Sequence, residues 1–202
     1  MKYFQEITLI PDEEATAYFL WSKLYTQLHV ALADVKNKYS IDGIGVSFPN
    51  YRYEEKNGKA FGTLGNKLRI FAPTEAILQT LDLVKRLDEH QMTDYVYIKA
   101  IRQIPEHVAY VRVRRIRAKS LERKIKDYAK YEGISYEEAK EYCQQHKKAS
   151  LMDYPYVQLK SLGNRHHFNL SVIQEEVTVP ISGKFNTYGI NSTSGQTTVP
   201  HW

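Results

Sequence analysis

The stretch YFQEITLIPDEEATAYFLWSKLYTQLHVALADV, residues 3–35, decides the fold. Its first part, Tyr3 to Ile10, alternates polar and apolar residues as a strand does, and this strand ends at Pro11. Asp12 can then cap a helix that reaches roughly Val35. Within the helix, apolar residues recur at three- and four-residue spacing, so they form one stripe that faces a sheet. The stripe consists of Ala17, Leu20, Trp21, Leu24, Leu28 and Ala31.

The following residues continue the alternation of strands and helices. Two strand candidates, Ile44 to Phe48 and Lys67 to Phe71, are separated by the polar stretch Tyr51 to Gly65, which fits a hairpin with a long loop. A second amphipathic helix follows Pro73, and Tyr95 to Ile101 alternates as a further strand. The apolar face of that helix consists of Ile77, Leu78, Leu81 and Val84. The order βαββαβ predicts a ferredoxin-like domain in an α+β protein.

The regular pattern lapses at Pro105, where we expect a second domain to begin. The predicted domains span residues 1–104 and 105–202, and the second is a smaller α+β domain with a basic strand and helix. We expect a basic helix that is capped by Ser120 and ended by Gly133, and a second helix that opens at the capping box Ser135 to Glu138 and reaches about Lys148. The strands are expected over Tyr156 to Ser161, Phe168 to Ile173 and Val177 to Ile181. The tail from Ser192 to Thr198 is expected to be a loop.

Composition narrows the class of protein. The single cysteine, Cys143, favours a reducing compartment, and no apolar run reaches the roughly eighteen residues of a membrane span, so we expect a cytoplasmic protein without a membrane segment. The neighbours His166 and His167 are expected to point to opposite faces of a strand, and no metal-binding or nucleotide-binding motif occurs. The sequence therefore predicts no metal site and no cofactor.

The positive charge is concentrated between Tyr110 and Lys130, where nine Lys and Arg face two acids for a net charge of +7, while the whole chain carries +5. A basic excess confined to one stretch is typical of a polyanion site, because phosphate contacts gain free energy by releasing condensed counterions. The stretch therefore indicates a nucleic acid ligand.

The basic stretch divides into a strand and a helix. On the strand, Arg115 and Arg117 share a face, about 7 Å apart, where a pair of guanidinium groups can read base edges or hold phosphates. A solvated edge strand is the alternative. On the helix, four cations fall within a stripe of roughly 60°. A short RNA hairpin fits this arrangement, although charge alone does not exclude duplex DNA. The predicted RNA-binding residues are Arg112, Arg114, Arg115, Arg117, Lys119, Arg123, Lys126, Lys130 and Phe168.

One histidine is a candidate for chemistry. His29 lies about 100° off the apolar stripe of the first helix, so it is not a core residue. An imidazole can act as general base near neutral pH, as RNA cleavage through the 2′-hydroxyl without a metal requires. Most histidines off a core face have no catalytic role. Phe168 is a core aromatic or a base-stacking platform, and the periodicity slightly favours the core.

Short motifs along nearly the whole chain resemble one family, the CRISPR-associated endoribonuclease of the type I-F system. The motifs, in order, are Leu28-His29, Ile44 to Pro49, Leu64-Gly65, Leu68 to Ile70, Arg115 to Ser120, His167 to Leu170, Tyr188-Gly189 and Val199-Pro200. The resemblance implies a ferredoxin-like domain joined to a domain with an arginine-rich helix. It implies cleavage of the repeat hairpin of precursor CRISPR RNA at the 3′ base of the stem.

The resemblance also implies roles for single residues. His29 takes the catalytic histidine position, Ser161 that of the serine holding the nucleophilic ribose, and Tyr188 that of the tyrosine beside the histidine. Arg115 matches the arginine that reads a guanine at the base of the stem, and Phe168 the aromatic that stacks on the terminal base pair.

This chain departs from the family at two points. Arg117 stands where the best-known pattern has a glutamine, so a guanine or a phosphate is expected in place of adenine, and Asp127 and lysines interrupt the usual run of arginines. We expect a metal-independent endoribonuclease that leaves a 2′,3′-cyclic phosphate and a 5′-hydroxyl, stays bound to its product and joins other subunits of a type I-F surveillance complex. The alternatives are an RNA-hairpin-binding subunit without activity and a basic DNA-binding module.

Overall fold

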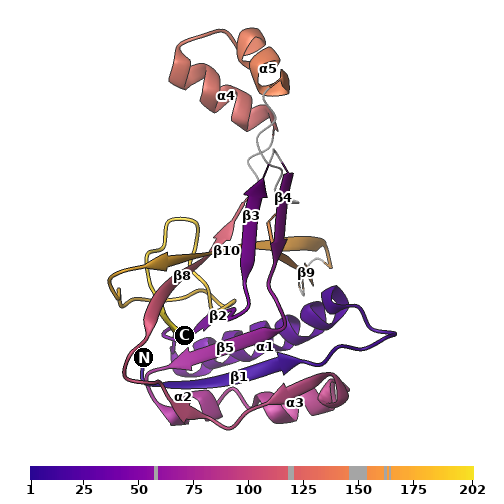
Figure 1. Cartoon of the computed structure of the whole chain (residues 1–202), viewed down its shortest axis with the longest axis vertical. Helices are drawn as coiled ribbons and strands as arrows, with labels where there is room; N and C mark the ends of the chain where they lie inside the picture. Colours follow the sequence, from indigo (N-terminus) through magenta and orange to yellow (C-terminus); the bar gives the residue numbers. More distant parts are fainter. Residues whose placement is uncertain (57–58, 118–120, 146–153, 162, 164) are drawn as a thin grey trace.

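The computed structural model describes residues 1–56, 59–117, 121–145, 154–161, 163 and 165–202. Two larger sheets, a two-stranded hairpin and a pair of helices make up the described part of the mixed α and β fold (Figure 1). The elements are β1 Tyr3–Leu9, α1 Ala17–Tyr39, β2 Gly45–Ser47, β3 Arg52–Lys56, β4 Lys59–Thr63, β5 Lys67–Ala72, α2 Glu75–Gln79, α3 Leu83–Glu89, the 3-10 turn Thr93–Tyr95, β6 Val96–Ile98, β7 Arg102–Gln103, β8 Ala109–Ile116, α4 Leu121–Glu132, α5 Tyr136–Gln145, β9 Tyr156–Lys160, β10 His167–Val177 and β11 Val199–His201.

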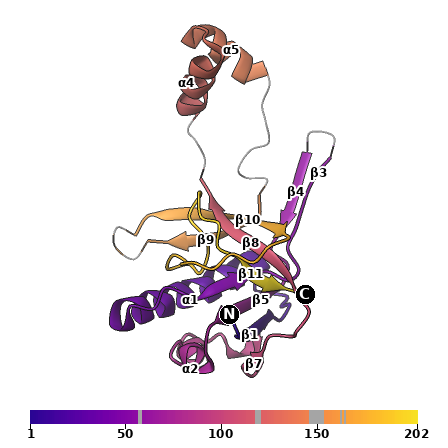
Figure 2. The ribbon, with the colours of Figure 1, turned by 90° about the vertical axis from the view of Figure 1, so that its left-hand side faces the viewer.

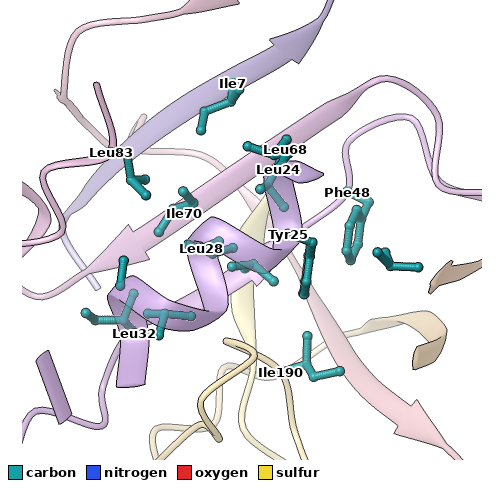
Figure 3. Packing of buried hydrophobic residues seen from close by; sticks show 14 of the residues in the cluster. Ile7, Leu24, Tyr25, Leu28, Leu32, Phe48, Leu68, Ile70, Leu83 and Ile190 are labelled. Atoms are coloured by element: carbon teal, nitrogen blue, oxygen red, sulfur yellow. The ribbon is translucent and has the colours of Figure 1, made fainter. Parts of the chain in front are cut away.

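The first sheet has the strand order β2-β5-β1-β6, and β7 also pairs with β1. All of its pairings are antiparallel, with Ile7 opposite Leu68 in the central pair. Helix α1 connects β1 to β2, while α2 and α3 connect β5 to β6. Figure 3 shows Leu24 and Leu28 of α1 directed at this sheet. The α1 helix is therefore fixed by its apolar face, as its periodicity predicts.

The start of α1 differs from the prediction. The helix begins at Ala17, because Thr16 is its cap and accepts a hydrogen bond from the N–H of Phe19 at 3.3 Å. Asp12 instead accepts from the N–H groups of Glu14 and Ala15 and closes a turn before the helix. Ala17 is exposed, so its place in the predicted stripe is wrong, while the other five stripe residues are buried.

The second sheet has the order β11-β8-β10-β9. Two of its strands differ from the prediction, because β10 is one continuous strand to Val177 and the residues after it are irregular. The last strand, β11, lies where the sequence predicts no strand. Helix α1 lies between the two sheets, and the Oγ of Ser22 donates to the carbonyl of Gln158 in β9 at 2.6 Å. One hydrophobic cluster thus draws on both sheets.

Two predictions in the first hundred residues are wrong in detail. The stretch predicted as a polar loop forms the hairpin β3-β4, in which Arg52 pairs with Thr63, and Figure 2 shows the hairpin standing out from the sheets. The single predicted second helix is broken into α2 and α3 by Asp82, which has φ +46. This break turns Val84 outward, with 60% of its surface exposed, while Leu78 and Leu81 stay buried.

Helices α4 and α5 form a separate helical lobe, which Figures 1 and 2 show standing away from both sheets. The capping box is confirmed, because Ser135 Oγ accepts from the N–H of Glu138 and the Glu138 carboxylate accepts from the N–H of Ser135. The Tyr128 and Tyr142 rings stack at 4.6 Å and join the two helices. Gly133, with φ +69, follows the end of α4 as predicted. The predicted cap Ser120 and the predicted end Lys148 lie outside the described residues.

Candidate active site

His29 lies in the second half of α1, on the side of the helix that meets the C-terminal region. Its Nδ1 is 2.8 Å from the carbonyl oxygen of Thr187. A carbonyl oxygen only accepts hydrogen bonds, so Nδ1 carries the proton in this contact. In the neutral ring the lone pair is then on Nε2. The backbone at Thr187 therefore fixes both the orientation of the ring and the nitrogen that can take up a proton.

Tyr188 stacks on the imidazole of His29, with ring centroids 4.2 Å apart and an angle of 12° between the planes. It sits in a tight turn closed by a hydrogen bond from the N–H of Gly189 to the carbonyl of Asn186. Gly189 has φ +71, and a Cβ there would lie 2.7 Å from Val46 Cγ1, so the turn requires glycine. The turn thereby sets the tyrosine ring against the histidine.

The turn is also held from below by α1. The hydroxyl of Tyr25 donates to the carbonyl of Tyr188 at 2.9 Å. Burial raises the pKa of Tyr25 far above its ordinary value, with a smaller contribution from Tyr188, so the hydroxyl stays protonated as a donor. Helix α1 thus positions the imidazole and anchors the turn that carries its stacking partner.

Three residues proposed for catalysis meet at one pocket. His29, Ser161 and Tyr188 line a pocket of about 240 Å³. Ser161 follows the end of β9, where its N–H donates to the carbonyl of His166 at 2.8 Å. The remaining described lining residues are Thr26, Leu159, Lys160, Gly163 and Phe168. The fold brings together side chains that are separated by up to 159 positions in the sequence.

An arginine and an aromatic ring flank this pocket. The Cζ of Arg115 lies 5.4 Å from the centroid of the Phe168 ring, and this ring meets Tyr188 edge-on at 6.4 Å. Burial, followed by the charge of Arg117, lowers the pKa of Arg115, and Tyr188 partly offsets this. Arg115 Nε is buried and has no hydrogen-bond partner among the described residues. Arg115 of β8 and Phe168 of β10 therefore place a partly desolvated cation and an aromatic ring next to the pocket that His29 lines.

The other arginines of β8 are placed differently. Arg112 and Arg114 both pair with Glu175 of β10, at 2.8 and 3.0 Å, so the structure does not bring them to the pocket. Hydrogen bonds from Arg114, and then Arg112, lower the pKa of the Glu175 carboxyl despite its partial burial. Because β8 lies between β11 and β10, the alternative of an edge strand is wrong. Arg117 is exposed just beyond the end of β8.

The predicted basic stripe lies on α4. Arg123, Lys126 and Lys130 are exposed, Ile125 is buried, and Lys119 lies outside the described residues. Lys126 pairs with Glu122 one turn earlier, at 2.6 Å. The stripe belongs to the helical lobe and takes no part in lining the pocket.

Several pocket residues are missing from the sequence prediction. Thr26 and Lys160 line the pocket, and Thr187 acts through its backbone carbonyl. Thr26 carries a weak signal, since it lies three positions before His29 on the same helix, whereas a backbone acceptor leaves no mark in the sequence. Among the described residues, no group of three or more His, Cys, Asp or Glu side chains could hold a metal ion, and no helix is long and apolar enough to cross a membrane.

Comparison with known proteins places the chain in a class. A family model described as "CRISPR-associated protein (Cas_Csy4)" matches residues 4–202. Two curated relatives named "CRISPR-associated endonuclease Cas6/Csy4" match. The one from Pseudomonas aeruginosa (strain UCBPP-PA14) is 30% identical and covers 95% of this chain and 96% of its own. The one from Escherichia coli (strain UTI89 / UPEC) is 26% identical and covers 96% of this chain and 97% of its own. The chain is therefore a member of a class of CRISPR-associated proteins, and its two curated relatives in this class are named endonucleases.

Within this class the chain can be assigned to a family. It belongs to the Cas_Csy4 family, as its motifs indicate. A solved structure titled "CRISPR associated protein Cas6" covers 98% of each chain at 10% identity, with a TM-score of 0.37, which is too low to support an argument about the fold.

Proposed function

We propose that this protein is a metal-independent endoribonuclease that cuts the repeat hairpin of precursor CRISPR RNA at the 3′ base of its stem. The observation that carries the proposal is the hydrogen bond between His29 Nδ1 and the carbonyl of Thr187, which leaves Nε2 as the basic nitrogen of a ring lining the pocket. The names of the two curated relatives support the class of reaction, and the arrangement of this pocket supports the mechanism.

The reaction needs a base and a positioned nucleophile. In the proposed step, Nε2 of His29 takes the proton of the 2′-hydroxyl upstream of the scissile phosphate. The 2′-oxygen forms a bond to phosphorus while the bond from phosphorus to the 5′-oxygen breaks, and the departing 5′-oxygen takes up a proton from water. The products are a 2′,3′-cyclic phosphate and a 5′-hydroxyl, and no metal takes part.

Ser161 and Tyr188 serve the histidine in this proposal. Ser161 holds the ribose that carries the nucleophile, which it can do because its side chain borders the same pocket as His29. Tyr188 keeps the imidazole in its plane through the stacking contact at 4.2 Å. The effect of positioning is large, because an attacking oxygen must lie in line with the bond that breaks.

The RNA stem lies between the pocket and the helical lobe in this proposal. Arg115 reads the base pair at the foot of the stem, and Phe168 stacks on it, since both flank the pocket. Arg117 extends the contact to a guanine or phosphate. The other predicted residues contact phosphates of the RNA backbone farther from the pocket. They are Arg112, Arg114, Lys119, Arg123, Lys126 and Lys130.

The proposal includes the finer fold and setting. We assign β1, α1, β2, β5, the helices α2 and α3, and β6 to a ferredoxin-like domain ending near residue 104, with residues 105–202 as the RNA-binding domain. A cytoplasmic location, retention of the cut hairpin and assembly with other subunits of a type I-F complex stay predictions.

The test is cleavage of the cognate repeat RNA in EDTA by wild type and by His29→Ala, with analysis of the product ends. We expect the variant to bind the hairpin within about threefold of wild type and to cleave about 100-fold or more slowly. Cleavage that stops in EDTA, or that persists undiminished in His29→Ala, contradicts the mechanism. Tight binding without cleavage by wild type favours the non-catalytic RNA-binding subunit, and equal affinity for duplex DNA at matched salt favours the DNA-binding module.

A further inference from the structure

The free edge of β9 faces the pocket at Lys160. Among the described residues, β9 is an edge strand that pairs only with β10, and Lys160 is opposite His167. The N–H of Ser161 donates to the carbonyl of His166. Backbone groups alternate in direction along an antiparallel strand, so those of Lys160 point away from β10.

The contact between α1 and β9 shows where this free edge points. Gln158 is two positions before Lys160, so its backbone groups point the same way, and its carbonyl accepts from Ser22 Oγ of α1. Four residues along α1 advance about 6 Å and two residues along a strand about 6.6 Å, so Lys160 lies level with Thr26. Both residues line the pocket with His29.

The Ser22 hydroxyl donates to the backbone carbonyl of Gln158, but the Thr26 hydroxyl makes no corresponding hydrogen bond to the backbone of Lys160. The Thr26 hydroxyl donates to the carbonyl of Ser22 at 2.7 Å, which turns it back along its own helix. The hydrogen bonding between α1 and β9 therefore ends at Gln158. The N–H of Lys160 is directed into the space between the helix and the strand. Thr26 and Lys160, on the two sides of this space, line the same pocket as His29.

Lys160, which lines the pocket, also carries a positive charge on its side chain. Lys160 is exposed, and no Asp or Glu among the described residues pairs with it. Among the described residues that line the pocket, Lys160 is the only lysine or arginine, and none is an aspartate or glutamate. A backbone donor and an ammonium group on one residue form a site for an oxyanion.

We propose that Lys160 is a further catalytic residue that binds a non-bridging oxygen of the scissile phosphate. This inference rests on the proposed function, because it assigns the group that stabilises the charge of that reaction. As the 2′-oxygen bonds to phosphorus, negative charge builds up on the non-bridging oxygens. The N–H of Lys160 donates to one of these oxygens, and its ammonium group lowers the energy of the added charge without transferring a proton.

The first experiment compares Lys160→Ala and Lys160→Arg with wild type in EDTA, under single turnover with protein in excess. Affinity is measured with a repeat RNA that has a 2′-deoxy nucleotide at the nucleophile. We expect Lys160→Ala to cleave about 10-fold more slowly with affinity within about threefold of wild type, and Lys160→Arg to recover most of the rate. Lys184→Ala, at an exposed lysine paired with Asp42, is the matched control and is expected to behave as wild type.

The second experiment tests contact with the oxygen itself. Each non-bridging oxygen is replaced in turn by sulfur, a weaker hydrogen-bond acceptor. Wild type is expected to slow about 10-fold or more on one of the two diastereomers. Lys160→Pro, which removes an N–H that points away from β10, is expected to lose that preference. Equal rates of wild type on the two diastereomers, or an unchanged rate of Lys160→Ala, overturn this inference.

The outcomes separate the two proposals. A wild type that does not cleave in EDTA overturns both the proposed function and the role of Lys160. A wild type that cleaves, a His29→Ala variant that does not, and Lys160 variants that cleave as wild type leave the proposed function standing and overturn this inference alone.

Discussion

The two-sheet body and the helical lobe are built on different physical principles. The body buries α1 between two sheets, with Tyr25, Leu28 and Ile70 fully inaccessible. The described part of the lobe buries Ile125 and Ala139 and relies on one pair of stacked tyrosine rings. Close packing holds the side chains of the body in place to within a few tenths of an ångström. The small core of the lobe maintains the arrangement of its two helices but not the positions of individual side chains. The difference suits the proposed division of roles, in which the body holds the pocket of His29 and the lobe presents exposed cations.

If the two-sheet body fixes the geometry of the pocket, we expect disruption of its buried ion cluster to have the largest effect on stability of all the predicted changes. Glu6 is 2% exposed and bonds Arg69 and Lys99, each at 2.7 Å. Burial raises the pKa of Glu6, but the hydrogen bonds from Lys99 and Arg69 and the charges of Arg69 and Lys67 outweigh this and lower it below its ordinary value. Glu6→Gln is expected to lower the free energy of unfolding by about 3 kcal/mol at pH 7, because Arg69 loses its buried counter-charge.

The sign of the pH dependence follows from that lowered pKa. The contribution of Glu6 to stability is complete above about pH 4.5 and is lost as pH falls through the folded-state pKa. Denaturant unfolding followed by tryptophan fluorescence should therefore show a difference between wild type and Glu6→Gln that shrinks below pH 4.5. Glu89→Gln, at an exposed ion pair with Lys85, is the control. A difference independent of pH would contradict the assignment.

Two glycines with the same backbone conformation sharpen the comparison. Gly189 in the body has φ +71, and a methyl group added to it would lie 2.7 Å from Val46 Cγ1, while Gly133 in the lobe has φ +69 and nothing within 4 Å of the same position. Gly189→Ala is expected to cost about 2 kcal/mol and to slow cleavage, since the turn carrying Tyr188 must move. Gly133→Ala should cost about 1 kcal/mol, from backbone strain alone.

Thermal unfolding and single-turnover cleavage of both glycine variants check this pair. Equal losses of stability, or a slower reaction in Gly133→Ala at saturating protein, would mean that the lobe and the body do not act as separate units.

A charge in the lobe is expected to affect affinity and its dependence on salt. Lys130→Ala removes an exposed cation of the α4 stripe. We expect weaker hairpin binding at low salt and a plot of log affinity against log salt whose slope falls by about 1, with the saturating cleavage rate unchanged. Filter binding over a salt series measures this, and Lys184→Ala is the control. An unchanged slope would remove Lys130 from the interface.

The smallest expected effect on the whole molecule comes from the tyrosine stack. Tyr128→Ala separates α4 from α5 by removing one of the two stacked rings. We expect faster hydrogen exchange over residues 121–145 and a melting temperature of the body that stays within about 2 °C of wild type. A cooperative loss of stability across the whole chain would show that the lobe is part of the body.

The sequence predicts what depends on local periodicity. The apolar stripe of α1, the place of His29 off that stripe and the capping box at Ser135 all follow from spacing along one element. Hairpin β3-β4 escapes prediction because, in the part of the chain that the structure describes, its polar strands pair only with each other, so no core face marks them. The break between α2 and α3 also escapes prediction, because it depends on the backbone conformation of one residue, Asp82.

The site is predicted less completely from the residues themselves. His29 stands out by its position, but Ser161 and Tyr188 enter only through the family resemblance, because their meeting depends on how a distant turn packs on α1. The acceptor for Nδ1 is the backbone of Thr187, and the proposed donor of Lys160 is also backbone. Groups of this kind are set by sheet register and turn geometry, which side-chain patterns do not encode.

The central claim is that the body sets the rate and the lobe sets the affinity. It is tested most directly by measuring both quantities for His29→Ala and for a variant with Lys126 and Lys130 replaced by Ala. We predict a single-turnover rate about 100-fold lower with unchanged affinity for His29→Ala, and an affinity about 10-fold lower with an unchanged saturating rate for the lobe variant. A His29→Ala protein that cleaves at the wild-type rate, or a lobe variant whose saturating rate falls as far, would contradict the claim.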